Sequence, residues 1–331
     1  MKRAALWPEH SLPAHHVPPP WPGRHVRLDG TLVHVRDTPA TGPGAEPALY
    51  VHGLGGSAQN WTDLAGLLAD RLDGQAIDLP GFGRSEPGPR YTIPSFAERV
   101  IRWIEHSDRG PVHLFGNSLG GAISVRVAAL RPDLVRAHPG LARAAVPGLP
   151  PLVAGADAPA AGHPRGERLA AWRLAQFSPE VTAQQVMEAC VADLTRISEQ
   201  RRQEAIDEIR VRYEAAHYAA AYVRTFRGLV GSFLRSYLPG EGALWRQASA
   251  VRAPTLVVGG RQDRLVDVRV APQAARVIPD SRLLMLDGVG HVAQLEVPRT
   301  VARAVLGLLA EATPSLITGM GESGTERDMA G

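Results

Sequence analysis

Gly116-Asn117-Ser118-Leu119-Gly120 follows the apolar run Val112-His113-Leu114-Phe115 and precedes a stretch of small residues with helical character, 121–130. This order predicts a strand, a Gly-x-Ser-x-Gly turn and a helix, which together form a nucleophile elbow. The turn is so tight that the serine takes strained backbone angles, and only small neighbours let the strand and helix come this close. We therefore expect Ser118 to project its hydroxyl at the carboxyl end of a sheet.

A serine hydroxyl becomes a nucleophile when a nearby base takes its proton and an acid orients that base. Asp263 directly follows a short apolar run at 255–260 that ends in glycines. His291 leaves the next predicted strand, 282–286, in a glycine-flanked loop. Both side chains are therefore expected beyond the carboxyl ends of strands, where Ser118 is also expected.

Other residues compete for these three roles. Asp267 and Asp287 are alternative acids, but Asp287 precedes glycine as a turn former does, and Asp263 lies nearest a strand end. His52 and His113 are alternative bases. His113 lies inside a predicted strand, where a hydrogen-bonded core histidine is the expectation, and His52 precedes the glycine-rich loop at 53–56. Ser118 could be a simple N-cap, although a cap does not require glycine on both sides.

Backbone donors for a developing oxyanion have a candidate source in His52-Gly53-Leu54-Gly55-Gly56, which follows the apolar run 48–51. The glycines leave a backbone N–H free to point at an anion, and that of Leu54 is the expected donor. The second expected donor is the N–H of Leu119, just after the serine.

These motifs, together with Asp78-Leu79-Pro80-Gly81-Phe82-Gly83-Arg84-Ser85 and the chain order serine, acid, histidine, resemble the α/β-hydrolase superfamily. The resemblance covers about residues 25–136 and 250–310. It implies a mostly parallel sheet flanked by helices, with a helical lid inserted between its two halves. It also implies a triad of Ser118, His291 and Asp263, a two-donor oxyanion hole, and a structural hydrogen bond for His52. Because position 118 is not aspartate, the chain differs from the dehalogenase and epoxide hydrolase branches.

The expected organisation has four parts: an irregular segment at 1–24, a core at 25–136 and 250–313, a lid or cap insertion at 137–249, and a disordered tail at 314–331. Alternation around Asp29-Gly30 predicts a hairpin at 26–36. Helical periods at 167–176, 179–194 and 198–238, with Ser178-Pro179 as a cap, predict the lid. The histidines of the first segment have uneven spacing and no acidic or cysteine partner, so a solvated linker is expected and not a metal site; they are His10, His15, His16 and His25.

Residues 137–166 depart from the family pattern, which has a buried strand here between those carrying Ser118 and Asp263. The sequence reads Ala137-His138-Pro139-Gly140-Leu141 and stays rich in Pro, Gly and Ala. Proline and glycine suit a central parallel strand badly, so a poor strand is expected, with 141–146 as the alternative. One hypothesis is that this segment is translated out of the family's reading frame. The activity of the chain depends on how well this strand forms.

The composition excludes several function classes. The net charge is +3, with arginines scattered among acids and no basic run interleaved with aromatics, so nucleic-acid binding is not expected. Cys190 is the sole cysteine, so no intramolecular disulfide can form. No signal peptide, membrane span, metal-ligand cluster or dinucleotide loop is found, which predicts a cytoplasmic protein without cofactor or metal. The oligomeric state stays open.

The expected function is hydrolysis of a carboxylic ester of a small to medium, largely apolar substrate through an acyl-enzyme. The apolar and aromatic residues of the insertion are the basis for the substrate expectation. Two alternatives remain at this point. One is hydrolysis of a carbon-carbon bond of the meta-cleavage-product type, which the same triad supports, and the other is a catalytically silent binding protein with this fold.

Overall fold

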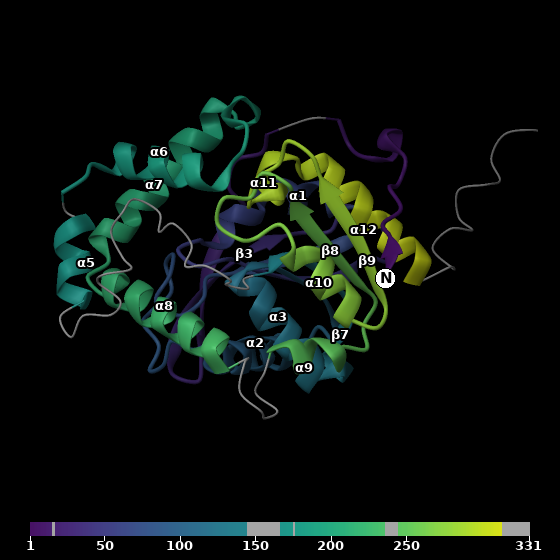
Figure 1. The fold of residues 1–331 in the computed structure, drawn as a ribbon, viewed down its shortest axis with the longest axis horizontal. Coiled ribbons are helices and arrows are strands. Elements are labelled where there is room, and N and C mark those ends of the chain that lie inside the picture. The colour runs from purple at the N-terminus through teal and green to yellow at the C-terminus, as the bar shows by residue number, and fades with distance from the viewer. Residues whose placement is uncertain (15–16, 144–165, 175, 236–243, 313–331) are drawn as a thin grey trace, which may run out of the picture.

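A nine-stranded sheet forms the centre of the computed structural model, which describes residues 1–14, 17–143, 166–174, 176–235 and 244–312 (Figure 1). The strand order is β1-β9-β8-β7-β6-β4-β5-β3-β2. The pairs β2–β3 and β3–β5 are antiparallel and the other pairs are parallel, so the sheet is mostly parallel, as predicted. The strands are β1 (Lys2–Arg3), β2 (Gly23–Leu28), β3 (Thr31–Thr38), β4 (Glu46–Val51), β5 (Leu72–Ile77), β6 (Val112–Ser118), β7 (Val135–Arg143), β8 (Thr255–Gly260) and β9 (Ser281–Leu286).

Helices cover both faces of the sheet, and β4 illustrates why. Its side chains alternate, so that Ala48 and Tyr50 join one hydrophobic cluster with α1, α11 and α12, while Leu49 and Val51 join the other with α2, α3, α9 and α10. Between β7 and β8 the chain forms α5 to α9, of which α5 to α8 lie to one side of the sheet in Figure 1 and α9 joins the helices that cover it. The helices are α1 (Thr62–Leu68), α2 (Ile93–Ser107), α3 (Leu119–Leu130), α5 (Gly166–Leu174), α6 (Pro179–Cys190), α7 (Glu199–Glu214), α8 (Tyr218–Arg235), α9 (Leu244–Ser249), α10 (Val270–Val277), α11 (Ala293–Glu296) and α12 (Pro298–Ala312).

Local sequence signals fix several boundaries. The predicted hairpin is confirmed, because β2 and β3 pair around Asp29 and Gly30, whose φ angles are 46° and 81°. Ser178 caps α6 by accepting a hydrogen bond from the N–H of Val181, with Pro179 in the first turn, as predicted. The prediction of a single helical segment at 198–238 is wrong, because the chain leaves helical geometry at Ala215 and forms α7 and α8 separately.

The central strand that the sequence disfavours is present. β7 pairs in parallel with β6 on one side and β8 on the other, and Pro139 and Gly140 both take part in the register with β8. The two neighbouring strands offer hydrogen-bonding partners along both edges, and this tertiary context overrides the poor local propensity. The core therefore extends through Arg143, beyond the predicted boundary at 136. Residues 144–165 lie outside the described part of the chain, as do the tail residues 313–331.

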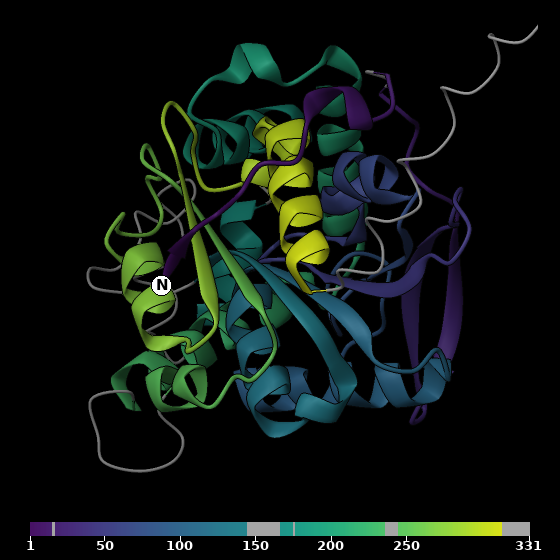
Figure 2. The same cartoon turned by 90° about the vertical axis from the view of Figure 1, so that its right-hand side faces the viewer.

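The N-terminal segment is not a solvated linker where it is described. β1 adds to the sheet edge beside β9, and the chain then runs along α12, where Glu9 forms an ion pair of 2.6 Å with Arg299 (Figure 2). Leu12 is buried. Further on, the carbonyl of Pro18 accepts a hydrogen bond of 2.7 Å from Arg201 of α7. The segment thus contacts both the C-terminal helix and the inserted helices. No local sequence pattern predicts these contacts between distant parts of the chain.

The described histidines of the N-terminal part lie in different elements. His10 is exposed, and His25 lies in β2 with its Nε2 3.0 Å from the carbonyl oxygen of Arg84. His15 and His16 are outside the described residues.

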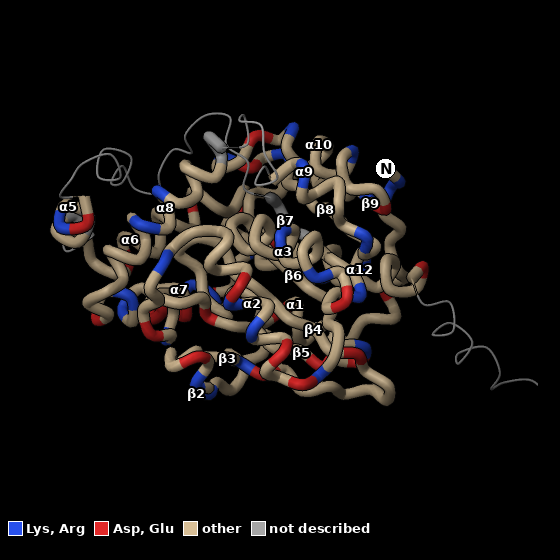
Figure 3. Tube along the Cα trace, turned by 90° about the horizontal axis from the view of Figure 1, so that it is seen from below, with Lys and Arg blue, Asp and Glu red and all other residues tan. Residues whose placement is uncertain are grey.

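Acidic and basic positions are interspersed along the elements seen in Figure 3. Within the described ranges, none of the helices combines the length and apolar character needed to cross a bilayer.

Candidate active site

Ser118 occupies the sharp turn between β6 and α3, as the sequence predicts. Its φ and ψ angles are 54° and −116°, a sparsely populated conformation for a residue with a side chain, which typically costs about 1–3 kcal/mol. A Cβ added at Gly116 would overlap the carbonyl of Gly120, and one added at Gly120 would overlap the carbonyl of Val51. The two glycines therefore allow α3 to start directly against the sheet and hold Ser118 in the strained turn.

His291 and Asp263 form a buried hydrogen-bonded pair. The distance between Nδ1 of His291 and Oδ2 of Asp263 is 2.8 Å, and each side chain is only 5% exposed. The other carboxylate oxygen, Oδ1, accepts hydrogen bonds from the N–H groups of Leu265 and Val266 at 2.8 and 2.9 Å. These two donors fix the carboxylate so that Oδ2 faces the imidazole. A proton held on Nδ1 leaves Nε2 free to act as an acceptor.

The two competing carboxylates are engaged elsewhere. Asp267 accepts the N–H of Arg269 at 2.8 Å near the start of α10, and the hydrogen bonds and charge of Arg269 lower the pKa of Asp267 to about 2. Asp287 has a side chain that is 85% exposed and pairs with Arg261. Asp263 is therefore the acid that the fold brings to the imidazole of His291.

Three of the five predicted site residues line one cavity of about 370 Å³, and Asp263 and Leu119 lie outside its lining. Ser118, His291 and Leu54 all line it, together with Asn117, whose side-chain amide donates a 3.2 Å hydrogen bond to the carbonyl of His291. Leu119 is buried, and because it begins α3 its N–H has no partner within the helix. The apolar part of the wall comes mainly from the inserted helices and the loop after β8, through Val186, Met187, Tyr218, Tyr222, Phe226, Leu229, Leu265 and Val266.

Cys190, the sole cysteine of the sequence, also lines the cavity. Burial raises the pKa of its thiol to about 12. The thiol is therefore protonated near neutral pH, and the reactive thiolate form is scarce. The hydroxyl of Ser118 remains the candidate nucleophile, because it shares the cavity with an oriented imidazole that can take its proton.

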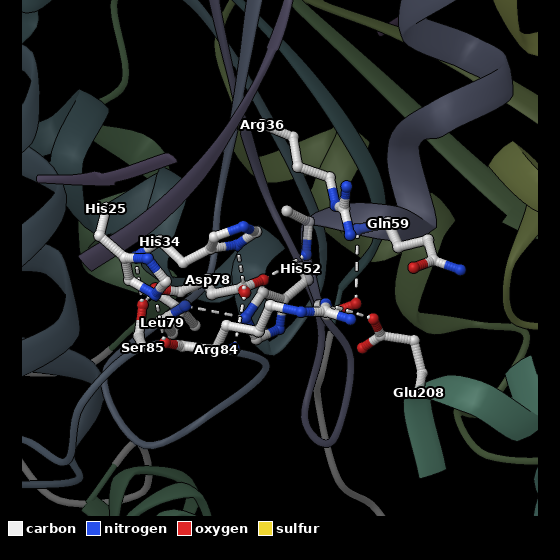
Figure 4. Close-up of polar contacts among 12 residues, drawn as sticks. His25, His34, Arg36, His52, Gln59, Asp78, Leu79, Arg84, Ser85 and Glu208 are labelled. Atoms are coloured by element: carbon white, nitrogen blue, oxygen red, sulfur yellow. Dashed lines mark hydrogen bonds and ion pairs between the residues drawn. The ribbon is translucent and has the colours of Figure 1, made fainter. Parts of the chain in front are cut away.

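The loop that carries Leu54 is fixed by a buried polar network (Figure 4). His52 accepts a 2.9 Å hydrogen bond from the N–H of Leu79 at Nε2, and its Nδ1 lies 2.7 Å from the carbonyl oxygen of Gly53. Asp78 accepts hydrogen bonds from Nδ1 of His34 at 2.8 Å and from the N–H of Ala58 at 2.6 Å. Burial alone would raise the pKa of Asp78, but these donors outweigh it and the pKa lies below its ordinary value.

The burial of His52 predicts that acid destabilises the protein. Loss of hydration lowers the pKa of His52 below its ordinary value of 6.5, so the folded state keeps the ring neutral while the unfolded chain takes up a proton below that value. The contribution of His52 to folding stability is therefore present above the pKa of the unfolded chain and is lost as the pH falls through that value. We expect the free energy of unfolding, measured with urea at pH 7 and pH 5, to fall by about 1 kcal/mol less in His52→Gln than in wild type. Parallel pH dependence in the two proteins would remove His52 as the cause.

Several residues of the site were not anticipated from the sequence. Arg84 pairs with the buried Glu208 of α7 at 2.7 Å and so links the loop after β5 to the inserted helices (Figure 4). Arg212, one turn further along α7, also lines the cavity, with its guanidinium 5.8 Å from the ring centre of Tyr218. The i, i+4 spacing of Glu208 and Arg212 places them on one helix face, but nothing in the sequence indicates that this face meets the cavity.

Comparison with known proteins finds relatives that match most of this chain. The chain is 29% identical over 257 residues to the dihydrolipoyllysine-residue acetyltransferase component of an acetoin cleaving system from Cupriavidus necator, covering 77% of this chain and 61% of that protein. It spans 64% of the length of the same component from Pseudomonas putida.

A second relative covers most of both chains. The 2-hydroxy-6-oxononadienedioate/2-hydroxy-6-oxononatrienedioate hydrolase of Cupriavidus pinatubonensis is 26% identical over 84% of this chain and 90% of its own. Among solved structures, a membrane phospholipase A superposes with a TM-score of 0.69 at 22% identity, covering 88% of this chain and 87% of that one. The family model of the alpha/beta hydrolase family matches residues 48–304, and the chain belongs to this family.

Proposed function

We propose that the chain is a serine hydrolase that cleaves a carboxylic ester of a small to medium, largely apolar substrate. Oγ of Ser118 attacks the carbonyl carbon while Nε2 of His291 takes its proton, and Asp263 stabilises the resulting imidazolium. The N–H groups of Leu54 and Leu119 hold the oxyanion. His291 then protonates the leaving alcohol, and a water molecule attacks the acyl-enzyme to release the acid and restore Ser118.

One observation carries the proposal: Ser118 and a histidine already oriented by a buried carboxylate line the same cavity. The apolar wall that α6 and α8 contribute supports an apolar substrate, since such surface binds hydrocarbon groups by excluding water. We further propose that α5 to α8 act as the lid of this cavity. The likeness to a phospholipase A is in keeping with ester chemistry.

The proposal is tested by labelling the protein with a fluorophosphonate and mapping the modified peptide. We expect a single adduct on the peptide that contains Ser118, together with turnover of p-nitrophenyl butyrate. A protein that is folded by circular dichroism yet unlabelled would instead be a catalytically silent binding protein. An adduct on another residue would refute the assignment of the nucleophile.

A second candidate is hydrolysis of a carbon-carbon bond in a substrate that carries a carboxylate. The observation that favours it is Arg212, which lines the cavity and forms no ion pair with any described residue. A guanidinium in such a place can bind a substrate carboxylate through two parallel hydrogen bonds. The name of the Cupriavidus pinatubonensis relative gives a dienedioate as its substrate, and a dienedioate carries carboxylates.

Replacing Arg212 by methionine separates the two candidates. If the substrate carries a carboxylate, we expect KM for a dienoate ring-fission product to rise about 30-fold, because a charge-assisted hydrogen-bond pair is typically worth about 2 kcal/mol. KM for p-nitrophenyl butyrate, which has no charge to bind, should stay within about threefold of wild type. Steady-state kinetics with both substrates measure this. An equal loss on both would assign Arg212 to the packing of the cavity wall.

A further inference from the structure

Glu296 is a fully buried carboxylate that has no part in the proposed chemistry. It ends α11, and its side chain has 0% exposure. Its Oε2 accepts hydrogen bonds from the N–H of Gly290 at 2.8 Å and the N–H of Ala192 at 3.1 Å. Its Oε1 accepts the N–H of Asp193 at 3.0 Å and lies 3.4 Å from Nη1 of Arg196. One carboxylate thus binds four donors.

The four donors come from two segments that are far apart in the chain. Gly290 lies directly before His291, in the loop that follows β9. Ala192, Asp193 and Arg196 belong to the 191–198 connection, which leads from α6 to α7. The loop that holds the imidazole and the connection between two inserted helices therefore meet at Glu296.

Direct contacts join the same two segments around the carboxylate. The N–H of His291 donates a 2.7 Å hydrogen bond to the carbonyl of Cys190, and Nη1 of Arg196 donates one of 2.7 Å to the carbonyl of Gly288. A Cβ added to Gly290 would lie 2.5 Å from the carbonyl oxygen of Cys190, so only glycine allows this approach. The backbone that leads into the imidazole, 288–291, is thus fixed against the end of α6 and the 191–198 connection.

We propose that Glu296 is a positioning residue that sets the orientation of His291 and couples it to the position of the inserted helices. Only a carboxylate can do this, because its two oxygens provide about four acceptor sites and no donor. An amide at the same position would accept at its oxygen alone and would turn an NH2 group toward two of the four donors. Movement of α6 and α7 would pull on the carboxylate and thereby on Gly290 and His291. The catalytic consequence rests on the proposed hydrolase function, but the holding of the loop does not.

The test is Glu296→Gln, which keeps the shape of the side chain. We expect kcat for p-nitrophenyl butyrate to fall about 30-fold with KM within threefold of wild type, because a small misplacement of a catalytic group can cost on the order of 10²-fold in rate. Hydrogen exchange of the peptide spanning 287–296 should become faster. The matched control is Glu46→Gln. Glu46 accepts from His113 and Arg136 at the amino end of β4, the opposite edge from the site, so kcat and loop exchange should not change there.

Unchanged exchange of the 287–296 peptide in Glu296→Gln, or a kcat within twofold of wild type, would overturn the proposal. A loss of thermal stability with both quantities unchanged would leave only a structural role for the carboxylate and would also overturn it. Failure of the proposed function is distinguishable, because wild type would then neither turn over the ester nor react with the fluorophosphonate. In that event the exchange measurement still decides whether Glu296 holds the loop.

Discussion

Replacing Ser118 by alanine is expected to lower kcat for p-nitrophenyl butyrate on the order of 10⁵-fold and to abolish fluorophosphonate labelling. The variant keeps His291, Asp263 and the two backbone donors, but no atom is left to form the acyl-enzyme. In triad enzymes, loss of the nucleophile alone costs about as much as loss of the whole triad, because the three groups act as a unit. The residual rate should come from the oxyanion donors and from binding.

The fold should survive this change, because alanine has the same backbone restrictions as serine and takes over the strained φ of 54° without a new steric conflict. The melting temperature is therefore expected to stay within a few degrees of wild type. Ser124→Ala is the matched control, since Ser124 is a buried serine in α3 that does not line the cavity. Comparable turnover in wild type and Ser118→Ala would show that the hydrolysis arises elsewhere.

Much of the site was predictable because its signals are local. The elbow at Ser118 needs small residues at positions 116 and 120, and the overlaps that a Cβ would cause there explain why the sequence has glycine. Asp263 and His291 each directly follow a predicted strand, so the rule that parallel strands end at one edge was enough to bring them together. In the structure the two side chains are joined by a hydrogen bond of 2.8 Å.

The strand β7 shows where local reasoning fails. Pro139 and Gly140 argue against a central strand when the segment is read alone, yet β6 and β8 flank it on both sides. The stability of β7 comes from hydrogen bonds to two neighbouring strands and from burial between two layers of helices. Both depend on residues far away in the chain, which a local propensity does not take into account. The same holds for the N-terminal segment, whose burial depends on α12 and α7.

The burial of two charged residues near the site could also not be predicted from the sequence, for a related reason. Glu208 pairs with Arg84, and Glu296 binds backbone donors of two distant segments. In the sequence each is an ordinary helical glutamate, a residue type that is mostly exposed. Only the three-dimensional arrangement reveals that the carboxylates have partners, and hence that burying them is tolerable.

Asp263→Asn is expected to lower kcat about 10⁴-fold while leaving the cavity intact, and the reason lies in the hydrogen bonds around the carboxylate. The N–H groups of Leu265 and Val266 both donate to Oδ1, so the amide oxygen of asparagine must take that position. Its NH2 group then faces Nδ1 of His291 and forces the imidazole to accept there. The proton moves to Nε2, and the ring can no longer take the proton of Ser118.

This outcome is measured by steady-state kinetics together with nitrogen NMR of the His291 ring, which distinguishes the two tautomers. Asp267→Asn is the matched control, because Asp267 interacts with Arg269 and not with the imidazole. It should keep kcat within about twofold of wild type. The tautomer of His291 and the rate are expected to change together. A ring still protonated at Nδ1 in Asp263→Asn, or an equal loss of kcat in the two variants, would mean that the pairing of Asp263 with His291 does not determine the rate.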